Sequence, residues 1–296
     1  MPGMPIIGTS VDREARRPLV LTALKALGTT CTKLDGANVL VTGARGFFGR
    51  YVVEALLEMN KLGAHPINIV AADSYAVGND EPRVEEWRNA PNLTLWRCDV
   101  AHSSGLLFGG QRFSHIWHLA GIASPYWYKK LPEETIAVAV DGTRNMLRYA
   151  REHKAKFMFC SSSEVYQIAE GNIPTPETYV GAIPSTNLRS CYDVSKLMGE
   201  TLCYVEAQKY GTHCSVVRFF NSFGVGMAEV DRRILPRIAS AMKSGKQMRV
   251  FSPTVHNDDT EQDISLRSML PRRTYSPAAN TLLGFLKVAL DGESMN

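Results

Sequence analysis

Short runs of β-branched and aromatic residues alternate with longer amphipathic stretches from Asn38 onward. Each short run has the length of a buried strand, and each longer stretch repeats apolar positions at helical spacing. This alternation predicts parallel strands joined by crossover helices, and hence an α/β fold of the Rossmann type with a doubly wound parallel sheet. The expected strands are 38–43, 67–73, 93–100, 115–121, 156–163 and 213–224, and the expected helices are 47–60, 132–153 and one that begins near 190.

The same pattern divides the chain into three parts. Residues 1–36 form an N-terminal extension, in which 14–27 predicts a short amphipathic helix packed on the body or on a partner subunit. Residues 37–222 form the sheet domain. Beyond Phe223 the alternation weakens, so 223–296 is expected to form a smaller lobe. Its expected elements are helices at 233–246 and 278–292, a short strand at 248–252 and an acidic loop at 254–270.

The composition is that of a globular protein, with 45% hydrophobic and 21% charged residues among 296. The formal charge of +4 suits anionic small molecules and is too small and dispersed to indicate nucleic-acid binding. We find no apolar run long enough to span a bilayer and no export-signal layout at the N-terminus, so we expect a cytoplasmic protein with no membrane partner. The six cysteines lack CxxC spacing, which favours free thiols, and we predict no metal site.

A glycine-rich turn follows the first expected strand. In VLVTGARGFFGR, Gly43, Gly46 and Gly49 stand where a tight turn lets the backbone approach a pyrophosphate at a helix N-terminus. Asp73 ends the next strand, 24 residues after Gly49, near the usual distance for a carboxylate that binds an adenosine ribose. That carboxylate would repel a 2′-phosphate, so the pattern favours NAD over NADP, although Arg45 in the turn weakens the preference. The alternative is a glycine-rich turn without a ligand.

Further cofactor contacts are expected beside this turn and at the ends of later strands. They are Phe47 and Phe48 in the turn, Asp99 and Val100 where an adenine edge would lie, and Leu119 and Ala120 after the fourth strand.

Tyr192 is followed four residues later by Lys196 in the stretch RSCYDVSK, which begins an expected helix. Two such side chains share one helix face. An ammonium beside a phenol favours the phenolate, which would bring the pKa of Tyr192 nearer to neutrality. The alternative is an ordinary surface pair. Cys191 adjoins the tyrosine, but no histidine nearby in the sequence offers itself as a base, so we interpret Cys191 as a packing residue.

The blocks TGARGFFG, HLAGIASPYWY, SSSEVY, LRSCYDVSK and RFFNSFG occur in an order and at spacings that resemble the extended short-chain dehydrogenase/reductase (NAD-dependent epimerase/dehydratase) family. The resemblance covers residues 38 to about 250, and HLAGIASPYWYKKLPEETI and LRSCYDVSK are similar to its UDP-glucuronate decarboxylase (UDP-xylose synthase) branch. It implies an NAD-binding Rossmann domain with the catalytic residues at 37–222 and a nucleotide-sugar-binding lobe at 223–296. We expect a homodimer that binds NAD and a nucleotide sugar.

The resemblance also implies roles for single residues. Tyr192 would remove the proton of the sugar 4-hydroxyl as hydride leaves C4 for NAD, Lys196 would hold the nicotinamide ribose, and Ser162 would hydrogen-bond the same sugar oxygen. Glu164 would lie beside C5 and C6 of the sugar. Expected substrate contacts are Ser124, Pro125, Tyr128, Arg189, Asn221 and Arg273.

Ser163 discriminates between the reactions of this family. The 4,6-dehydratases carry Asp-Glu where this chain has Ser163–Glu164, and serine is a poor general acid. The expected reaction is therefore decarboxylation of a UDP-hexuronic acid through a 4-keto intermediate. A nucleotide-sugar 4-epimerase, a 4,6-dehydratase and a catalytically impaired NAD-binding protein are the alternatives. Ala139, Pro277 and Asn280 depart from the family pattern.

Overall fold

The computed structural model describes residues 10–77, 87–102, 108–167, 174–227, 231, 233–245, 275–292 and 294–295. The expected strand at 248–252, the acidic loop at 254–270 and the expected substrate residue Arg273 lie outside the described residues. Among the helices that the structure describes, none has the length and hydropathy needed to cross a bilayer.

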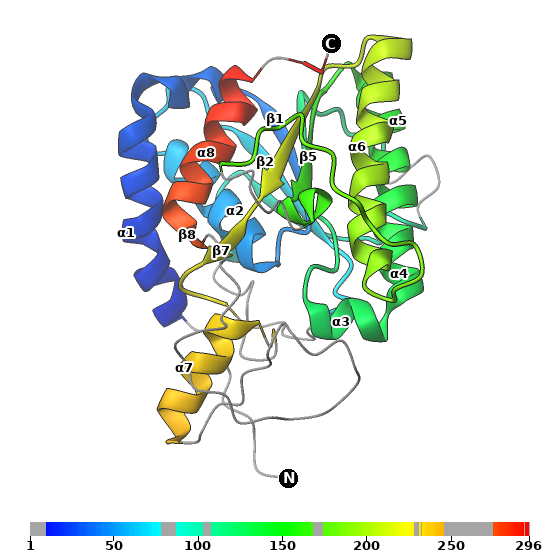
Figure 1. Ribbon diagram of the computed structural model, residues 1–296. Helices are drawn as coiled ribbons and strands as arrows, with labels where there is room; N and C mark the ends of the chain where they lie inside the picture. The colour runs from blue at the N-terminus through cyan, green and yellow to red at the C-terminus, as the bar shows by residue number, and fades with distance from the viewer. Residues whose placement is uncertain are drawn as a thin grey trace.

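Six parallel strands form the central sheet, as the alternating pattern predicts (Figure 1). Their order is β3-β2-β1-β4-β5-β6, so the chain proceeds from β1 toward one edge and then from β4 toward the other. Ligands of such sheets bind at the carboxyl ends of the strands where this direction changes, here between β1 and β4. The strands are β1 Asn38–Thr42, β2 Asn68–Asp73, β3 Leu93–Arg97, β4 His115–His118, β5 Lys156–Ser162 and β6 Cys214–Phe219.

Helices cover both faces of the sheet (Figure 1). α1, α2 and α8 share one apolar core with the sheet, and α5 and α6 share the other. The helices are α1 Ser10–Leu27, α2 Phe47–Met59, α3 Pro125–Lys130, α4 Pro132–Ala137, α5 Thr143–His153, α6 Ser190–Tyr210, α7 Ile234–Ser244 and α8 Ala278–Asp291, with 3-10 helices at Gly28–Leu34 and Ser163–Tyr166.

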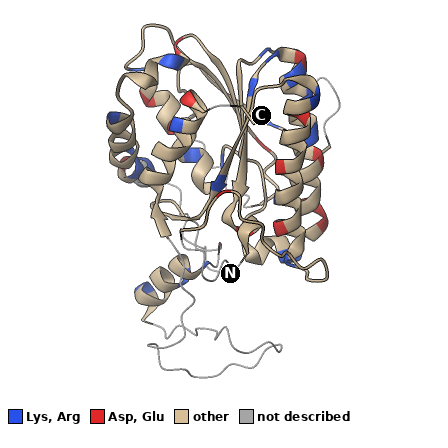
Figure 2. Ribbon diagram, turned by 45° about the horizontal axis from the view of Figure 1, so that its top comes forward, with Lys and Arg blue, Asp and Glu red and all other residues tan. Residues whose placement is uncertain are grey.

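The N-terminal helix α1 packs on the body of the protein, against α8 and α2. Its apolar stripe, which includes Val20 and Leu24, is buried against α8 residues such as Leu282 and Phe285. The helix expected at 14–27 therefore packs on the body of the protein, which is one of the two placements that its amphipathic pattern allowed. In the view of Figure 2, acidic and basic residues are interspersed along the helices and loops, which agrees with the small net charge.

Two expected elements are divided in the structure. The helix expected at 132–153 is interrupted by a π-helical turn, Val138–Gly142, which contains the buried Ala139. The strand expected at 213–224 ends as β6 at Phe219. After Phe220 the chain enters β7 (Asn221–Phe223), which pairs in parallel with β8 (Tyr275–Pro277) in a separate two-stranded sheet.

Candidate active site

A cavity of about 880 Å³ opens at the carboxyl ends of the strands, where the strand order changes direction. Its size is within the range of small-molecule and cofactor sites. The wall combines the glycine turn, the ends of four strands of the main sheet, the start of α6 and residues near α7. All the sequence-predicted site residues except Arg273 line this one cavity. Arg273 lies outside the described residues.

The glycine turn needs glycine at two positions. Gly43 has φ +68°, and a Cβ atom there would lie 2.7 Å from the backbone nitrogen of Ala120. A Cβ atom on Gly49 would lie 2.3 Å from the carbonyl oxygen of Gly43. Gly46 is the N-cap of α2, and no side chain caps this helix end. The turn therefore brings the bare, positive end of α2 to the cavity wall, an arrangement that fits a pyrophosphate.

Asp73 lies at the end of β2, on the same wall. Its Oδ2 accepts a hydrogen bond from the Arg45 backbone N–H and its Oδ1 from the Tyr75 backbone N–H, each at 3.0 Å. The Arg45 guanidinium stacks on the Tyr75 ring, 3.8 Å from its centroid. The turn and the strand end thus hold the carboxylate in one orientation, as a ribose-binding group requires. Nothing in the sequence indicated the Tyr75 contact.

Asp99 and Val100 follow β3 and line the same part of the cavity. The Asp99 carboxylate accepts a hydrogen bond from the Ala101 backbone N–H at 2.9 Å and lies 2.9 Å from Nδ1 of His102. Val100 is buried. An apolar side chain beside a carboxylate offers a surface for one edge of a purine.

Tyr192 and Lys196 are both buried in the first two turns of α6, with 8% and 4% of their surface exposed. This burial excludes the alternative of an ordinary surface pair. Ser162, at the end of β5, hydrogen-bonds the Tyr192 side chain, and this bond acts to lower the pKa of the phenol. The three side chains therefore meet at the cavity wall from two different elements.

The expectation that Lys196 lowers the pKa of Tyr192 is wrong for this protein without ligands. The Lys196 ammonium donates to the Cys160 carbonyl at 2.7 Å, and its Nζ lies 5.9 Å from the Tyr192 ring centroid. Burial raises the pKa of Tyr192, with a further rise from the Glu164 carboxylate, against the lowering by Ser162. Burial also lowers the pKa of Lys196 to about 8.

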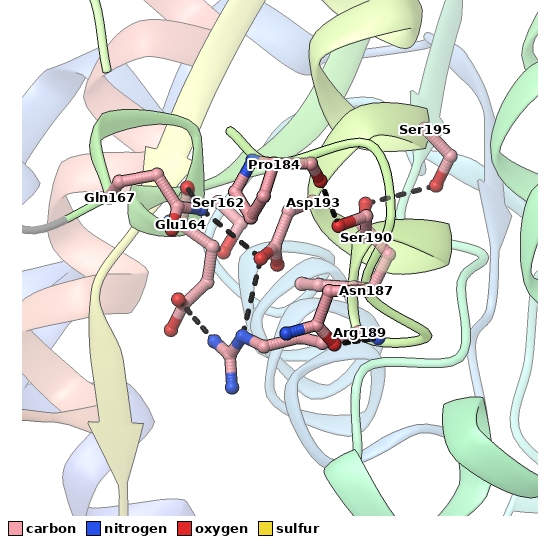
Figure 3. A network of polar contacts seen from close by, with 10 residues as sticks. Ser162, Glu164, Gln167, Pro184, Asn187, Arg189, Ser190, Asp193 and Ser195 are labelled. Atoms are coloured by element: carbon pink, nitrogen blue, oxygen red, sulfur yellow. Dashed lines mark hydrogen bonds and ion pairs between the residues drawn. The ribbon is translucent and has the colours of Figure 1, made fainter. Parts of the chain in front are cut away.

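Glu164 belongs to a network of charged side chains on one side of the cavity (Figure 3). Its carboxylate pairs with Nη2 of Arg189. The Nε of Arg189 donates to Oδ2 of Asp193 at 3.2 Å, and Gln167 donates to the same oxygen at 3.1 Å. Burial raises the pKa of Asp193, although Arg189 acts in the opposite direction. One guanidinium thus holds two carboxylates, and the sequence did not indicate that Asp193 takes part.

Tyr128, in α3, lies against Tyr192 with ring centroids 5.3 Å apart and ring planes 13° apart. Its side chain is 1% exposed, and its hydroxyl has no hydrogen-bond partner among the described residues. Burial raises the pKa of Tyr128 to about 12, so the hydroxyl keeps its proton and can donate to a ligand. Cys191 packs under this ring and donates weakly to the Tyr128 carbonyl at 3.4 Å, consistent with a packing role.

Ser124 and Pro125, at the start of α3, connect this wall to the segment before α7. The Ser124 hydroxyl donates to the Asp231 carbonyl at 2.7 Å. The Asp231 carboxylate accepts two hydrogen bonds from Arg233, at 2.5 and 2.6 Å. Arg233 lines the cavity, and its charge acts to lower the pKa of Tyr192. Sequence reasoning missed Arg233. Arg233 begins the helix expected at 233–246, but nothing in the sequence indicated where its side chain points.

The remaining predicted contacts come from strand ends. Leu119 and Ala120 follow β4, and Asn221 begins β7, all on the cavity wall. His118, beside Leu119, is fully buried, and its pKa falls to about 3 through desolvation, so it stays neutral. Among the described residues, no group of three or more His, Cys, Asp or Glu side chains could hold a metal ion.

A sequence model of the NAD dependent epimerase/dehydratase family matches residues 39–263 of the chain. The chain is 34% identical over 216 residues to UDP-glucuronic acid decarboxylase 3 of Arabidopsis thaliana, an alignment that covers 73% of this chain and 60% of the relative. It is 31% identical over 217 residues to UDP-glucuronic acid decarboxylase 1 of Xenopus tropicalis, which covers 73% of this chain and 48% of the relative. The match therefore spans about half to three-fifths of the length of these curated relatives.

Two solved structures illustrate the likeness of fold. One is dTDP-glucose 4,6-dehydratase from Bacillus anthracis in complex with NAD, with a TM-score of 0.69, 18% identity and coverage of 88% of this chain and 74% of that chain. The other is UDP-glucuronic acid 4-epimerase from Bacillus cereus in complex with UDP-glucuronic acid and NAD, with a TM-score of 0.67, 21% identity and coverage of 87% and 74%. They confirm the predicted Rossmann-type fold.

Proposed function

Because this chain belongs to the NAD-dependent epimerase/dehydratase family, we propose that it decarboxylates a UDP-hexuronic acid, UDP-glucuronate, through a 4-keto intermediate. The observation that carries the proposal is the meeting of Tyr192 and Ser162 with the Glu164–Arg189 pair around one cavity. Tyr192 and Ser162 suit the oxidation of a sugar hydroxyl. The Glu164–Arg189 pair suits a substrate that carries its own carboxylate. The similarity to UDP-glucuronic acid decarboxylases supports the same reaction.

The residues of the cavity fit NAD as the cofactor. The glycine turn and the end of α2 would hold the pyrophosphate, Asp73 the adenosine ribose, and Lys196 the nicotinamide ribose. When bound, NAD supplies a site that accepts hydride from the sugar and later returns it. The Lys196 ammonium already donates to the Cys160 carbonyl, which leaves two of its three protons for the ribose hydroxyls.

The proton chemistry falls to Tyr192 and Ser162. As the sugar C4 loses hydride, its hydroxyl must lose a proton, and the Tyr192 oxygen would accept that proton once deprotonated. The Ser162 hydroxyl hydrogen-bonds the phenol and would hold the same sugar oxygen. Burial raises the pKa of Tyr192, whereas the Ser162 hydrogen bond and the Arg233 charge act to lower it. These two groups would favour the phenolate, and the positive charge of NAD would act in the same direction when bound.

Decarboxylation then needs little acid catalysis. With a ketone at C4, the C6 carboxylate belongs to a β-keto acid, so the C5–C6 bond can break with release of CO₂. The electron pair of that bond forms a C4–C5 double bond, and the carbonyl electron pair moves onto the C4 oxygen, which gives an enolate. C5 then takes a proton before hydride returns to C4. We assign Arg189 to the substrate carboxylate and Glu164 to the neighbourhood of C5 and C6. Ser163, which lines the cavity without an acidic group, supports decarboxylation rather than loss of water.

We also propose that the protein works as a homodimer in the cytoplasm. Four apolar side chains lie exposed along α6, between 40% and 48% accessible: Val194, Leu197, Met198 and Val205. A second copy of the chain would cover this stripe. All six cysteines are free thiols, which agrees with a reducing compartment.

The test is incubation of the protein with UDP-glucuronate and NAD, followed by mass analysis of the nucleotide sugar. We expect release of CO₂ and a UDP-pentose lighter by the mass of CO₂. A product lighter by one water would indicate a dehydratase, and a product of unchanged mass but altered C4 configuration an epimerase. Either result would contradict the proposal.

A further inference from the structure

The first half of helix α1 makes a buried charged contact with α2. Arg16 of α1 and Glu54 of α2 are both 0% exposed, and Nε of Arg16 lies 3.2 Å from Oε2 of Glu54. Arg13 lies 3.5 Å from the other oxygen of the same carboxylate. Breaking such a pair by removal of one partner is costly, because it leaves a charge buried without compensation.

The same side of α2 holds the segment that follows β7. Arg50, one turn before Glu54, donates a hydrogen bond from Nη2 to the Gly226 carbonyl. The Tyr51 hydroxyl, fully buried, donates to the Val225 carbonyl at 2.9 Å. Two adjacent residues of α2 thus bind two adjacent carbonyls of residues 224–227.

Arg16 itself reaches this segment. Gly226 has φ +88°, and a Cβ atom placed there would lie 3.0 Å from Nη2 of Arg50 and 3.5 Å from Nη1 of Arg16. Gly226 and Met227 line the cavity, although Arg16 does not. The Arg16 side chain therefore lies next to a segment that lines the binding cavity.

We propose that Arg16, with Arg50 and Tyr51, positions residues 224–227 so that this wall is formed for the nucleotide sugar. The inference rests on the proposed function and extends it to one residue of α1, Arg16, which lies outside residues 37–222. These are positioning residues, because they act through the backbone of the segment and not on the substrate. We assign NAD binding to the glycine turn and Asp73, so we expect it to depend little on this segment.

The chain offers matched controls. Arg17 and Glu58 join the same two helices through a second ion pair, 3.0 Å between Nε and Oε1. Among the described residues, the hydrogen bonds and ion pairs of these two side chains go to each other and to Lys61, and not to residues 224–227. Tyr149 is another buried tyrosine whose hydroxyl donates to a backbone carbonyl, that of Gln111 at 2.6 Å, again away from the cavity. If Arg16 only held α1 on α2, the Arg16 and Arg17 variants should bind the nucleotide sugar alike. If the Val225 carbonyl only satisfied the buried Tyr51 hydroxyl, the Tyr51 and Tyr149 variants should also bind it alike.

The experiment compares Tyr51→Phe and Arg16→Met with the controls Tyr149→Phe and Arg17→Met. Calorimetry measures the dissociation constants for UDP-glucuronate and for NAD, and thermal unfolding measures stability. Loss of one hydrogen bond that shapes the wall should weaken UDP-glucuronate binding by about threefold to tenfold in Tyr51→Phe. Arg16→Met should weaken it at least as much. NAD affinity should stay at the parent value in all four variants, and the controls should bind UDP-glucuronate like the parent.

Each other result overturns the inference. If Tyr51→Phe, which removes one oxygen and retains the ring, binds UDP-glucuronate as the parent does, the segment does not depend on α2. If the variants and controls lose affinity in proportion to their loss of stability, the contacts are only structural. If the parent protein binds NAD but no nucleotide sugar, the proposed function is wrong. The inference is then wrong too, because it rests on that function.

Discussion

The phenol ring of Tyr192 lies nearly parallel to that of Tyr128, with centroids 5.3 Å apart. Tyr192 belongs to α6 and Tyr128 to α3, so two elements far apart in the sequence meet at this contact. The two hydroxyls differ in their surroundings. That of Tyr192 is bound by Ser162, whereas that of Tyr128 has no partner among the described residues.

Substitution of Tyr128 by Phe should change stability and substrate binding in opposite directions. A buried hydroxyl without a partner is costly, so its removal should raise the free energy of unfolding of the ligand-free protein by about 1 kcal/mol. The same change should weaken UDP-glucuronate binding, because we expect the substrate to supply the missing partner. Chemical denaturation and calorimetry measure the two effects. A variant that is less stable and binds equally well would contradict this prediction.

Tyr192→Phe should remove the acid–base group and leave the cavity intact. We expect the rate of reduction of bound NAD by UDP-glucuronate to fall by about 10²- to 10⁴-fold. NAD affinity should hardly change, because only the hydroxyl is lost. Stopped-flow absorbance of the reduced nicotinamide measures the rate, and calorimetry the affinity. Retention of most of the rate would exclude Tyr192 as the base.

Lys196 should make stability depend on pH in the alkaline range. Its pKa is lowered from 10.5 to about 8 in the folded protein, chiefly by burial. Between these two values the unfolded chain binds a proton that the folded chain lacks, so this group makes stability rise with pH, by up to about 1.4 kcal/mol per pH unit. Below about pH 8 its contribution is constant.

The measurement is the unfolding free energy of the parent and of Lys196→Met between about pH 7 and 9.5, on either side of the lowered pKa of Lys196. The difference between parent and variant should be flat up to about pH 8 and should then change in favour of the parent. A difference that does not change with pH would mean that Lys196 keeps its ordinary pKa.

Arg189→Met should weaken the binding of one nucleotide sugar much more than that of another. If Arg189 binds the substrate carboxylate, UDP-glucuronate affinity should fall by about tenfold or more, as for loss of a charged hydrogen bond, while UDP-glucose affinity changes little. Arg144→Met serves as a control, because Arg144 pairs with Asp141 on an exposed helix surface. Equal losses for both sugars would restrict Arg189 to holding Glu164 and Asp193.

Leu197→Glu combined with Val205→Glu should convert a dimer into a monomer. Both side chains are exposed on α6, at 41% and 48%, and a buried carboxylate at a subunit contact would be costly. Sedimentation velocity measures the mass of the parent and the variant. Leu62→Glu, at a position that is 67% exposed elsewhere on the surface, is the control and should leave the mass unchanged. A parent that sediments as a monomer would contradict the proposal.

The sheet and the glycine turn were predictable because their signals are local. Strand-length apolar runs and the spacing from Gly49 to Asp73 are properties of neighbouring residues, and the structure has the turn and the carboxylate on one wall. The proton chemistry was less predictable. The spacing of Tyr192 and Lys196 suggested that they pair, but the ammonium is bound by Cys160, which lies 36 residues away on β5. Arg233 and Asp193 were missed for the same reason, since tertiary packing decides their direction.

The contact of α1 with α8 joins the first described helix to the last, and the ion pair of Lys33 with Asp291 spans 258 residues. Loop closure over such a distance is slow compared with local pairing. On the ribosome, α1 is synthesised before α8, so its apolar stripe meets its partner only when α8 has emerged. The exposed stripe is then a site where a chaperone could bind or where nascent chains could aggregate. The order of synthesis therefore leaves this half of the core until last.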